Sequence, residues 1–549
     1  MPSRPWSRPR RHRDHCGTLA TVAGWERTGR PRSRDGVVSP PVNRTVSPRR
    51  DSVAAGVGRV SPADRLAVMG MALIAILFTL WQLDHARNAT YGVWHGTSWS
   101  PYDEGVYLVS ARALDTGQVI FQQVFSSQPP LFLALLALFL KIGGGSAGAG
   151  HVYTLVCGLM ALAGVAWLCW EIGGRWAALL SLTLLALSPG FVIAARAIEA
   201  EAPMLGFGSL AVAASARYAR LGGRRWMLMS AILLACATLS KLLAVGDAAP
   251  IALALLLGQP LEDRAEWVKR VVTDGALALV VFAIPILTFF LALSPAAQYD
   301  QVIRFHLRAS AVVPATGNGG LFHTFLGWDP GLVAVAVLGL AVAVMGKRRL
   351  ILLPLIWIVA TAGSMINYHP LFIHHLTVLL APLAALGGLA AALPLTASRV
   401  SPRRLVAGAL LVVAGLVYLV WLPDLLDHDR HAFVADHNPI TAAAAGWLDA
   451  HSAPRDLVVV DDQELAVAAN RLVPSALTDT SIVRYDAGYL SLPLLVQATQ
   501  NPRVRAILLT RKLHDDQGYV VWLRAHFQSV SPPPALPSAL AFVARAGGG

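Results

Sequence analysis

The repetition of long apolar segments limits the folds open to this chain more than any other feature. Runs of about 17–23 residues, each long enough to cross a bilayer as a helix, alternate with short polar or Arg-bearing loops. Of the 549 residues, 55% are hydrophobic and only 14% are charged, which excludes an ordinary soluble protein. We therefore predict a polytopic α-helical membrane protein with about eleven transmembrane helices, at 65–83, 151–171, 175–194, 202–219, 226–242, 245–259, 271–293, 330–345, 350–366, 372–393 and 404–422.

The distribution of Lys and Arg predicts how these helices are oriented, because such residues collect in cytoplasmic loops. All the basic loops lie on one side only if the apolar segment 131–140, about 15 Å long as a helix, returns to the outer face instead of crossing. We thus expect a multi-pass protein of the cell membrane (inner or plasma membrane), with the N-terminus in the cytoplasm and the C-terminus outside. The basic loops are the N-terminal leader and residues 217–225, 262–270, 347–349 and 399–404.

The net charge of +13 comes mainly from the N-terminal leader. Residues 1–50 contain twelve Arg and three acidic residues, so this segment alone carries +9. A basic excess confined to a Pro- and Arg-rich segment predicts a disordered cytoplasmic extension that contacts anionic lipid, and not a nucleic-acid partner. The alternative is that translation starts further along the chain, near Met69.

The change of pattern near residue 430 predicts separate domains. We expect a leader at 1–62, a membrane domain at 63–425, a small external α/β domain at 426–535 and a flexible tail at 536–549. Within the external domain, short apolar runs predict strands and longer periodic stretches predict helices. The expected strands are 456–461, 505–510 and 519–523, and the expected helices are 440–450, 462–470 and 490–500.

An acidic pair, Asp103 and Glu104, lies in a polar segment between the first apolar span and the rest of the predicted bundle. The pair opens a helical pattern that ends at Gly117, and the sequence Gln-Pro-Pro-Leu follows at 128–131. Carboxylates beside a bilayer are costly to desolvate and are therefore typical of functional sites. We predict that Asp103, with Glu104 beside it, acts as a general base. The alternative is that Ser100 or Asp103 simply caps the helix.

Charged residues gather again on the same predicted external face. Arg196, Glu199 and Glu201 lie together at the end of one span, and Lys241 lies near the external end of another. Glu199 and Glu201 are candidates for a second catalytic or metal-binding acid. Arg196 and Lys241 are candidates for binding a phosphate. The alternatives are an interfacial Arg–Glu pair and a Lys side chain that extends to the membrane surface.

Two further groups of basic residues lie in predicted external loops. Arg304 and His306 can donate hydrogen bonds to a phosphate, although an ordinary basic interfacial helix is the favoured alternative. His369, His374 and His375 do not have the i, i+4 spacing of a helical zinc site. For His374 and His375 we therefore expect hydrogen bonds to a phosphate or sugar. Metal dependence stays open, with a divalent metal as one alternative, and no other cofactor is expected.

The order of these residues resembles that of a known family. The segment Tyr-Asp-Glu-Gly-Val-Tyr at 102–107 is followed by Gln-Pro-Pro-Leu at 128–131, Arg196 to Glu201, Ser240-Lys241, His374-His375 and Pro382. Over residues 65–400 this order resembles the C-type (GT-C) integral-membrane glycosyltransferases. That group includes the protein O-mannosyltransferases, the aminoarabinose transferase of lipid A and the rhizobial lipopolysaccharide galacturonosyltransferases.

The resemblance implies a polytopic catalytic domain at 63–425, an active site on the external face and an isoprenoid-phosphate sugar as donor. By this resemblance, Asp103 is the base on the acceptor hydroxyl, Glu201 or Glu199 is the second acid, and Lys241 or Arg304 faces the donor phosphate. The implied reaction moves a hexosyl or pentosyl group from a polyprenyl phosphate to a lipid, glycan or protein acceptor, with inversion. The chain departs from several relatives in having Gln128 before Pro-Pro, and its second acid is Glu where Asp is commoner.

Two other classes of function compete with this hypothesis. A transporter or lipid flippase places charges near the middle of the bilayer and often contains repeated halves, whereas here the charges lie near one surface and no halves match. A non-enzymatic membrane scaffold that presents the 426–535 domain would not need the polar clusters of the membrane domain. Both alternatives are therefore less favoured than a transferase.

Overall fold

The computed structural model describes residues 61–88, 101–258, 263–312, 318–345, 349–366, 368–392, 408–409, 412–423 and 439–545. The predicted leader lies almost wholly outside these ranges, as do the basic loop at 399–404 and the end of the predicted tail at 546–549. All the described residues belong to one compact unit, Val60–Gly549.

Helices make up most of this unit, and each predicted span contains a described helix. Up to residue 258 the helices are α1 (Pro62–Asn88), α2 (Pro101–Asp115), α3 (Pro130–Ile142), α4 (Ala147–Gly173), α5 (Arg175–Ala186), α6 (Pro189–Ala194), α7 (Glu201–Leu221), α8 (Arg224–Ser240), η1 (Leu242–Asp247) and α9 (Ala248–Leu257). From residue 263 to the end of the bundle they are α10 (Arg264–Ala292), α11 (Pro295–Tyr299), η2 (Asp300–Arg304), α12 (Phe305–Val312), α13 (Asn318–Trp328), α14 (Pro330–Met345), η3 (Arg349–Ile351), α15 (Leu352–Ile366), η4 (Ile373–Leu379), α16 (Leu380–Ala391) and the helix Val412–Pro423.

Several spans differ in detail from the predicted continuous helices. The span at 175–194 breaks after α5, because Pro189 begins a new helix and the Ser188 hydroxyl accepts a hydrogen bond from Phe191 N at its start. By length and composition, five described helices can cross a membrane, or six if the bent pair α13–α14 is one span. The protein is therefore rich in membrane-type helices, and the predicted number of about eleven stays a prediction.

The segments between the long helices are more ordered than their polar sequences suggest. Helix α3 has 13 residues and so is shorter than a full span, and its return to the outer face stays a prediction. The predicted external loop at 294–328 is largely helical, with α11, a π-helical turn η2, α12 and α13 following one another. Of these helices, α13 packs against η4, which contributes His374 and His375 to the candidate site.

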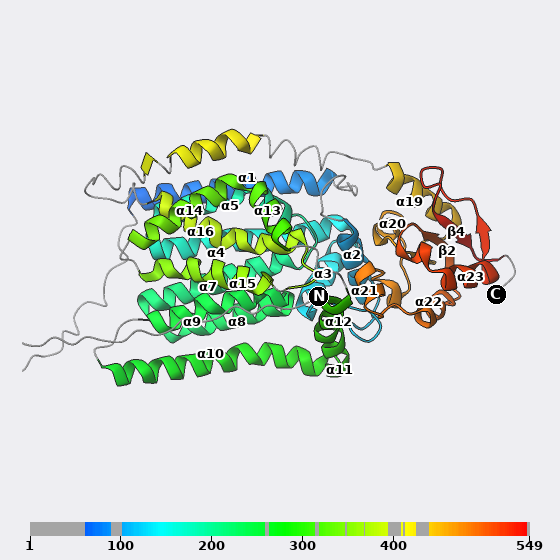
Figure 1. The fold of residues 1–549 in the computed structure, drawn as a ribbon, viewed down its shortest axis with the longest axis horizontal. Coiled ribbons are helices and arrows are strands. Elements are labelled where there is room, and N and C mark those ends of the chain that lie inside the picture. Colours follow the sequence, from blue (N-terminus) through cyan, green and yellow to red (C-terminus); the bar gives the residue numbers. More distant parts are fainter. Residues whose placement is uncertain are drawn as a thin grey trace, which may run out of the picture. The chain divides into compact units, whose positions relative to one another are not determined.

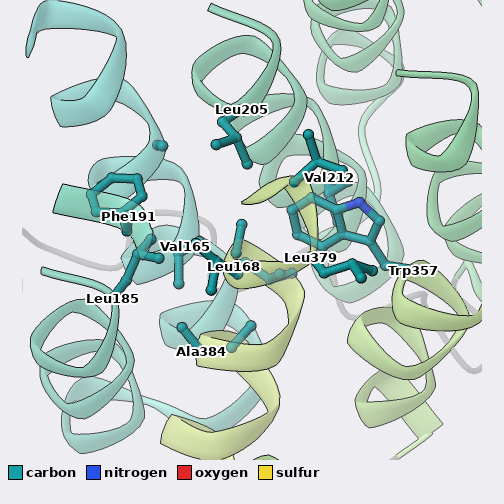
Figure 2. Close-up of a cluster of buried hydrophobic side chains, with 14 of the residues drawn as sticks. Val165, Leu168, Leu185, Phe191, Leu205, Val212, Trp357, Leu379 and Ala384 are labelled. Carbon is teal, nitrogen blue, oxygen red and sulfur yellow. The ribbon is translucent and has the colours of Figure 1, made fainter. Parts of the chain in front are cut away.

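The core of the bundle lies between α4, α7 and the helices that pack around them. Figure 1 shows α4, α7 and α8 running side by side, with α10 along α8. Small residues allow the α4–α7 contact, since a Cβ on Gly164 would lie 2.6 Å from the backbone of Ser209. Large apolar side chains from different helices fill the space beside this contact, among them Val165, Leu168, Phe191, Leu205, Val212, Trp357 and Leu379 (Figure 2).

The C-terminal region, residues 439–545, forms a four-stranded sheet with helices beside it. The strands β1 (Leu457–Val460), β2 (Val504–Leu509), β3 (Gln528–Val530) and β4 (Leu540–Val543) lie in the order β1-β2-β4-β3. β1 and β2 are parallel, and β4 is antiparallel to both β2 and β3. The helices are α19 (Pro439–His451), α20 (Gln463–Ala468), η5 (Ser475–Leu477), α21 (Ile482–Asp486), α22 (Leu492–Thr499), η6 (Lys512–Asp515) and α23 (Gln517–His526).

Both faces of the parallel strands β1 and β2 are largely buried, which explains why their sequences are mostly apolar. Val458 and Val460 pack in the same buried cluster as Leu108 of α2 and Leu133 of α3, whereas Val459 packs in a second cluster within the C-terminal region. One face of the sheet therefore shares a hydrophobic core with the segments that follow the first membrane helix.

Two predictions for the C-terminal region are wrong. The apolar run at 519–523 is helix α23 and not a strand; Asp516 caps the helix by accepting a hydrogen bond from Tyr519 N. The segment 536–549, predicted as a flexible tail, contains β4, which lies between β2 and β3 in the sheet. The sequence on either side of β4 is rich in Pro, Ala and Gly, so the strand pattern of these four residues is not evident. The predicted strands at 456–461 and 505–510 and the three predicted helices are present.

Candidate active site

Four segments of the chain bring their charged side chains together at one end of the helical bundle. They are the start of α2, the turn before α7, the end of α8, and η4. We call the residues Asp103, Glu199, Glu201, Lys241, His374 and His375 the site cluster. Asp103 is half-buried and the other five are buried.

An ion pair between Lys241 and Glu201 forms the centre of the site cluster. The two side chains are only 4% and 2% exposed, so each charge depends on the other for compensation. Lys241 occupies this position because α8 ends there. Its extended backbone, with φ −155° and ψ 136°, separates α8 from the tight turn η1.

The two His side chains lie beside the same carboxylate. His374 Nε2 is 3.7 Å from Glu201 Oε1, and His375 Nε2 is 3.9 Å from the same oxygen. On its other side, His374 Nδ1 lies 3.9 Å from Glu199 Oε1. His374 is thus placed between two carboxylates.

The Glu199 side chain can accept a further hydrogen bond inside the site. Within the described part of the chain, its buried Oε2 atom has no hydrogen-bond partner. Burial raises the pKa of this carboxyl well above its ordinary value, and the neighbouring Glu201 and Asp103 carboxylates raise it further. Such a group readily holds a proton or accepts a donor from a bound molecule.

Two overlapping sets of side chains have the separations needed to hold a metal ion. In the set Glu201, His374 and His375, and in the set Asp103, Glu199 and His374, the potential ligand atoms all lie within 4.8 Å of one another. Carboxylate oxygens with imidazole nitrogens suit zinc and other first-row divalent ions. In the first set an ion would compete with Lys241 for Glu201.

The acidic pair of α2 divides into two different environments. Glu104 Oε1 accepts a hydrogen bond of 2.9 Å from Ile198 N, which attaches α2 to the turn before α7. The Asp103 carboxylate forms no hydrogen bond with any residue that the structure describes. Burial raises the pKa of Asp103 to about 7; the Asp479 and Glu201 carboxylates also raise it, while Lys241 and Arg511 oppose the rise. Asp103 therefore suits the role of a base near neutral pH.

The remaining candidates lie away from the centre of the cluster. Arg196 Nε donates to Gln82 Oε1 at 2.6 Å, and its guanidinium lies 5.3 Å from the ring centre of Trp81, so it packs against α1. Arg304 forms a 3.4 Å ion pair with Asp300 one helical turn away, and its side chain is 56% exposed. This arrangement agrees with the basic-helix alternative for Arg304.

His306 reaches the edge of the site through aromatic neighbours. Its ring is 6.4 Å from the ring of Tyr368, which is 5.4 Å from the ring of His375. His306 Nδ1 lies 2.8 Å from Val302 O, a contact within its own helical segment. Burial lowers the pKa of His306, so the ring is neutral near neutral pH.

Sequence reasoning missed the residues that the C-terminal region contributes. The Tyr102 hydroxyl lies 3.3 Å from Thr480 Oγ1, which is 378 residues further along the chain. The guanidinium of Arg511 stacks 4.4 Å from the centre of the Tyr102 ring. Neither Thr480 nor Arg511 belongs to a recognisable motif, and no local pattern could reveal a contact over that separation.

Comparison with known proteins gives a family model and several solved structures. Residues 127–289 match the family model described as dolichyl-phosphate-mannose-protein mannosyltransferase. No curated protein sequence matches the chain significantly. The crystal structure of ArnT from Cupriavidus metallidurans bound to undecaprenyl phosphate is similar with a TM-score of 0.60 and 14% identity, over 88% of this chain and 99% of that chain.

The same ArnT protein in its apo state is similar with a TM-score of 0.55 and 14% identity, over 87% of this chain and 98% of that chain. These matches extend over the membrane helices and the C-terminal region together. At this level of identity they establish the fold and leave the roles of individual residues to the site geometry.

Proposed function

We propose that this protein, which has the fold of the C-type membrane glycosyltransferases, transfers a sugar from a polyprenyl-phosphate donor to an acceptor hydroxyl. The observation that carries the proposal is the site cluster itself, in which the Asp103 carboxylate, the buried Lys241 and two His side chains converge at one end of the bundle. The ArnT structure of the same fold contains undecaprenyl phosphate, a lipid of the proposed donor class.

The chemistry requires a base on one side of the reacting carbon and cations on the other. The acceptor oxygen attacks the anomeric carbon, the bond from that carbon to the phosphate oxygen breaks, and the acceptor proton passes to Asp103. The polyprenyl phosphate leaves as an anion. A single displacement of this kind inverts the anomeric configuration.

Lys241 and His374 are the groups proposed to stabilise the leaving phosphate. Lys241 is an ammonium donor, and its present partner Glu201 orients it before a sugar donor binds. His374 lies 3.7 Å from the same carboxylate and so can donate to the same phosphate. Donors aimed at an oxygen that gains charge in the transition state lower the barrier directly.

A divalent cation is compatible with this arrangement. Glu201, His374 and His375 fit a bound ion because their ligand atoms lie within 4.8 Å of one another, and this set leaves Asp103 available as the base. A bound cation would supply Lewis-acid stabilisation of the phosphate charge. Lys241 would then be displaced from Glu201 and become available to the donor.

The position of the site on α7 supports its proposed location on the external face. Glu201 is the first residue of this 21-residue helix, which spans about 31 Å at the helical rise. The opposite end of α7 carries Arg217 and Arg220, both paired with Glu171. If these Arg residues face the cytoplasm, as the positive-inside rule predicts, the site cluster faces outward. We accordingly propose a cell-membrane protein with a cytoplasmic N-terminus, catalytic helices over 63–425 and an external C-terminal region.

Transfer by purified protein in lipid vesicles is the test of this function. The protein is offered a panel of polyprenyl-phosphate sugars with lipid, glycan and peptide acceptors, and wild type is compared with Asp103→Asn. The matched control is Asp115→Asn, an exposed acid at the other end of α2. Sugar transfer that is lost only in Asp103→Asn supports the proposal. Movement of the donor across the vesicle without transfer would instead support a flippase, and no turnover by folded protein would contradict the enzyme.

A further inference from the structure

The start of α2 is held from two sides. On the side of the bundle, Glu104 accepts the hydrogen bond from Ile198 N. On the other side, Tyr102 and Gly105 contact the C-terminal region. Asp103 lies between these contacts, and its own carboxylate is not hydrogen-bonded to any described residue. The position of the proposed base therefore depends on what holds its neighbours in the chain.

Tyr102 is fixed by two residues of the C-terminal region. Its hydroxyl accepts a hydrogen bond of 3.1 Å from Thr480 N and lies 3.3 Å from Thr480 Oγ1, and the side chain is almost completely buried. The Arg511 guanidinium covers the ring at 4.4 Å from its centre, a cation–π geometry.

The two C-terminal residues are themselves held firmly. Thr480 Oγ1 accepts a hydrogen bond of 3.0 Å from Gln463 Nε2. The backbone N–H of Arg511 donates to Asp461 Oδ2 at 2.8 Å, and the same buried carboxylate accepts from Thr510 N at 2.6 Å. The residues that contact Tyr102 are thus held in position relative to the sheet, because Asp461 directly follows β1 and Thr510 directly follows β2.

Gly105 brings the two regions into close backbone contact. A Cβ built on Gly105 would lie 2.4 Å from Glu464 N and 2.8 Å from the carbonyl carbon of Gln463. No side chain can occupy that space without moving α2 away from α20. The three residues Tyr102, Glu104 and Gly105 therefore confine Asp103 from both sides.

We propose that Thr480 and Arg511 are positioning residues of the active site, which hold Asp103 in place through Tyr102, so that the C-terminal region completes the catalytic centre. This proposal rests on the transferase function proposed above. Displacing a catalytic group by about 1 Å can reduce the rate on the order of 100-fold. The residues proposed to bind the donor phosphate, Lys241 and His374, lie on other elements, so loss of the Tyr102 contacts affects turnover more than donor binding.

The test compares Arg511→Ala, Arg511→Lys and Arg505→Ala in the full-length protein in lipid vesicles. Arg505 is the matched control because it is an exposed Arg on β2 of the same region. We expect Arg511→Ala to lower kcat on the order of 10- to 100-fold with little change in KM for the donor. Arg511→Lys keeps a cation over the ring and should recover most of this loss. Arg505→Ala should match wild type.

A milder variant and a measurement of thermal stability distinguish a loss of positioning from misfolding. Tyr102→Phe removes the hydroxyl that contacts Thr480 and keeps the ring under Arg511, so we expect a loss of severalfold in kcat with an unchanged thermal midpoint. Wild-type kcat in both Arg511→Ala and Tyr102→Phe would overturn the proposal, as would an equal loss in Arg505→Ala or a change confined to KM. Failure of the proposed function itself is distinguishable, because wild type would then show no transfer with any donor.

Discussion

Buried carboxylates with basic partners lie at both ends of α7, where Glu201 begins the helix and Glu171 of α4 pairs with the Arg residues of its last turns, yet the two ends differ in how their charges are balanced. At the end of the helix, the fully buried Glu171 side chain is paired with Arg217 and Arg220, whose side chains are 31% and 40% exposed. Trp167 Nε1 also donates to Glu171 at 3.0 Å. One acid thus has two cations and a hydrogen bond. Each carboxylate oxygen of Glu171 is in an ion pair with one Arg, which balances the buried charge near the predicted membrane surface.

At the start of α7, acids outnumber bases. The site cluster contains three carboxylates, Asp103, Glu199 and Glu201, and one Lys. Its ion pair is almost completely buried on both sides, and one carboxylate oxygen of Glu199 has no partner among the described residues. A buried excess of acid is unfavourable unless a proton, a cation or a bound donor compensates it. The comparison supports the proposal that the Glu171 end stabilises the bundle and that the site cluster performs chemistry.

The largest effect should come from replacing the carboxylate at each end of α7 by its amide. Asp103→Asn removes the proposed base and should lower the transfer rate on the order of 10²- to 10⁴-fold with little loss of stability. Glu171→Gln should have the opposite profile, with a lower thermal midpoint and near-normal kcat per folded molecule. Transfer assays and thermal unfolding of both variants check this. A comparable loss of kcat in both variants would contradict the assignment of a structural role to Glu171 and a catalytic role to Asp103.

The next largest effect concerns the basic residues at the two ends of α7, whose removal should change stability by different amounts. Lys241→Met leaves the buried Glu201 charge unpaired, which should destabilise the fold by about 3–5 kcal/mol. Arg217→Ala removes a partly exposed cation whose partner keeps Arg220, so the effect should be about 1 kcal/mol or less. Denaturant unfolding in detergent measures both. Adding Glu201→Gln to Lys241→Met should restore stability without restoring transfer, and restored transfer would show that Lys241 is not needed by the donor.

The third prediction compares a glycine at the α2–α20 contact with a glycine at an open position of α19. Gly105→Ala inserts a methyl group where α2 meets α20, so α2 must shift and kcat should fall on the order of 10- to 100-fold. Gly446→Ala is the matched control, because no heavy atom lies within 4 Å of a Cβ at this position of α19. The control should retain activity and gain up to about 1 kcal/mol of stability from helix propensity. Normal kcat in Gly105→Ala would show that the α2–α20 contact does not position the base.

The smallest effect concerns pH. The pKa of Asp103 is raised to about 7, and a base acts only when deprotonated, so kcat/KM should fall as the pH drops below about 7, approaching tenfold per pH unit. Glu171→Gln should leave the profile unchanged, because Glu171 lies at the other end of α7, away from the site cluster. A profile that is flat down to pH 5 in folded enzyme would exclude Asp103 as the titrating base.

Local features of the fold were accessible from the sequence. The positions of the apolar runs follow from hydropathy alone, and each contains a helix in the described structure. Helix α2 begins at the acidic pair, and the chain leaves it near Gly117, whose φ of +91° favours glycine. The strands β1 and β2 were also predicted, because β1 has four buried apolar residues in a row and β2 has five buried apolar residues interrupted only by the exposed Arg505.

Other elements misled sequence reasoning because local pattern does not record long-range pairing. Helix α23 has as apolar a sequence as a strand, and only its capping by Asp516 and packing against the sheet distinguish it. Strand β4 is four residues in a Pro-rich segment and exists because β2 and β3 offer unpaired backbone groups on either side of it.

The sequence by itself predicted a bundle of apolar helices and gave Asp103, Glu201, Lys241 and His374 as candidate site residues on one face of it. Only the tertiary structure decided that Lys241 pairs with Glu201, 40 residues away, while Arg196 packs against α1. It alone joined Tyr102 to Thr480, across 378 residues. The reason is physical: hydropathy and helical period act over a few residues, whereas the partner of a buried charge is selected by the packing of whole helices.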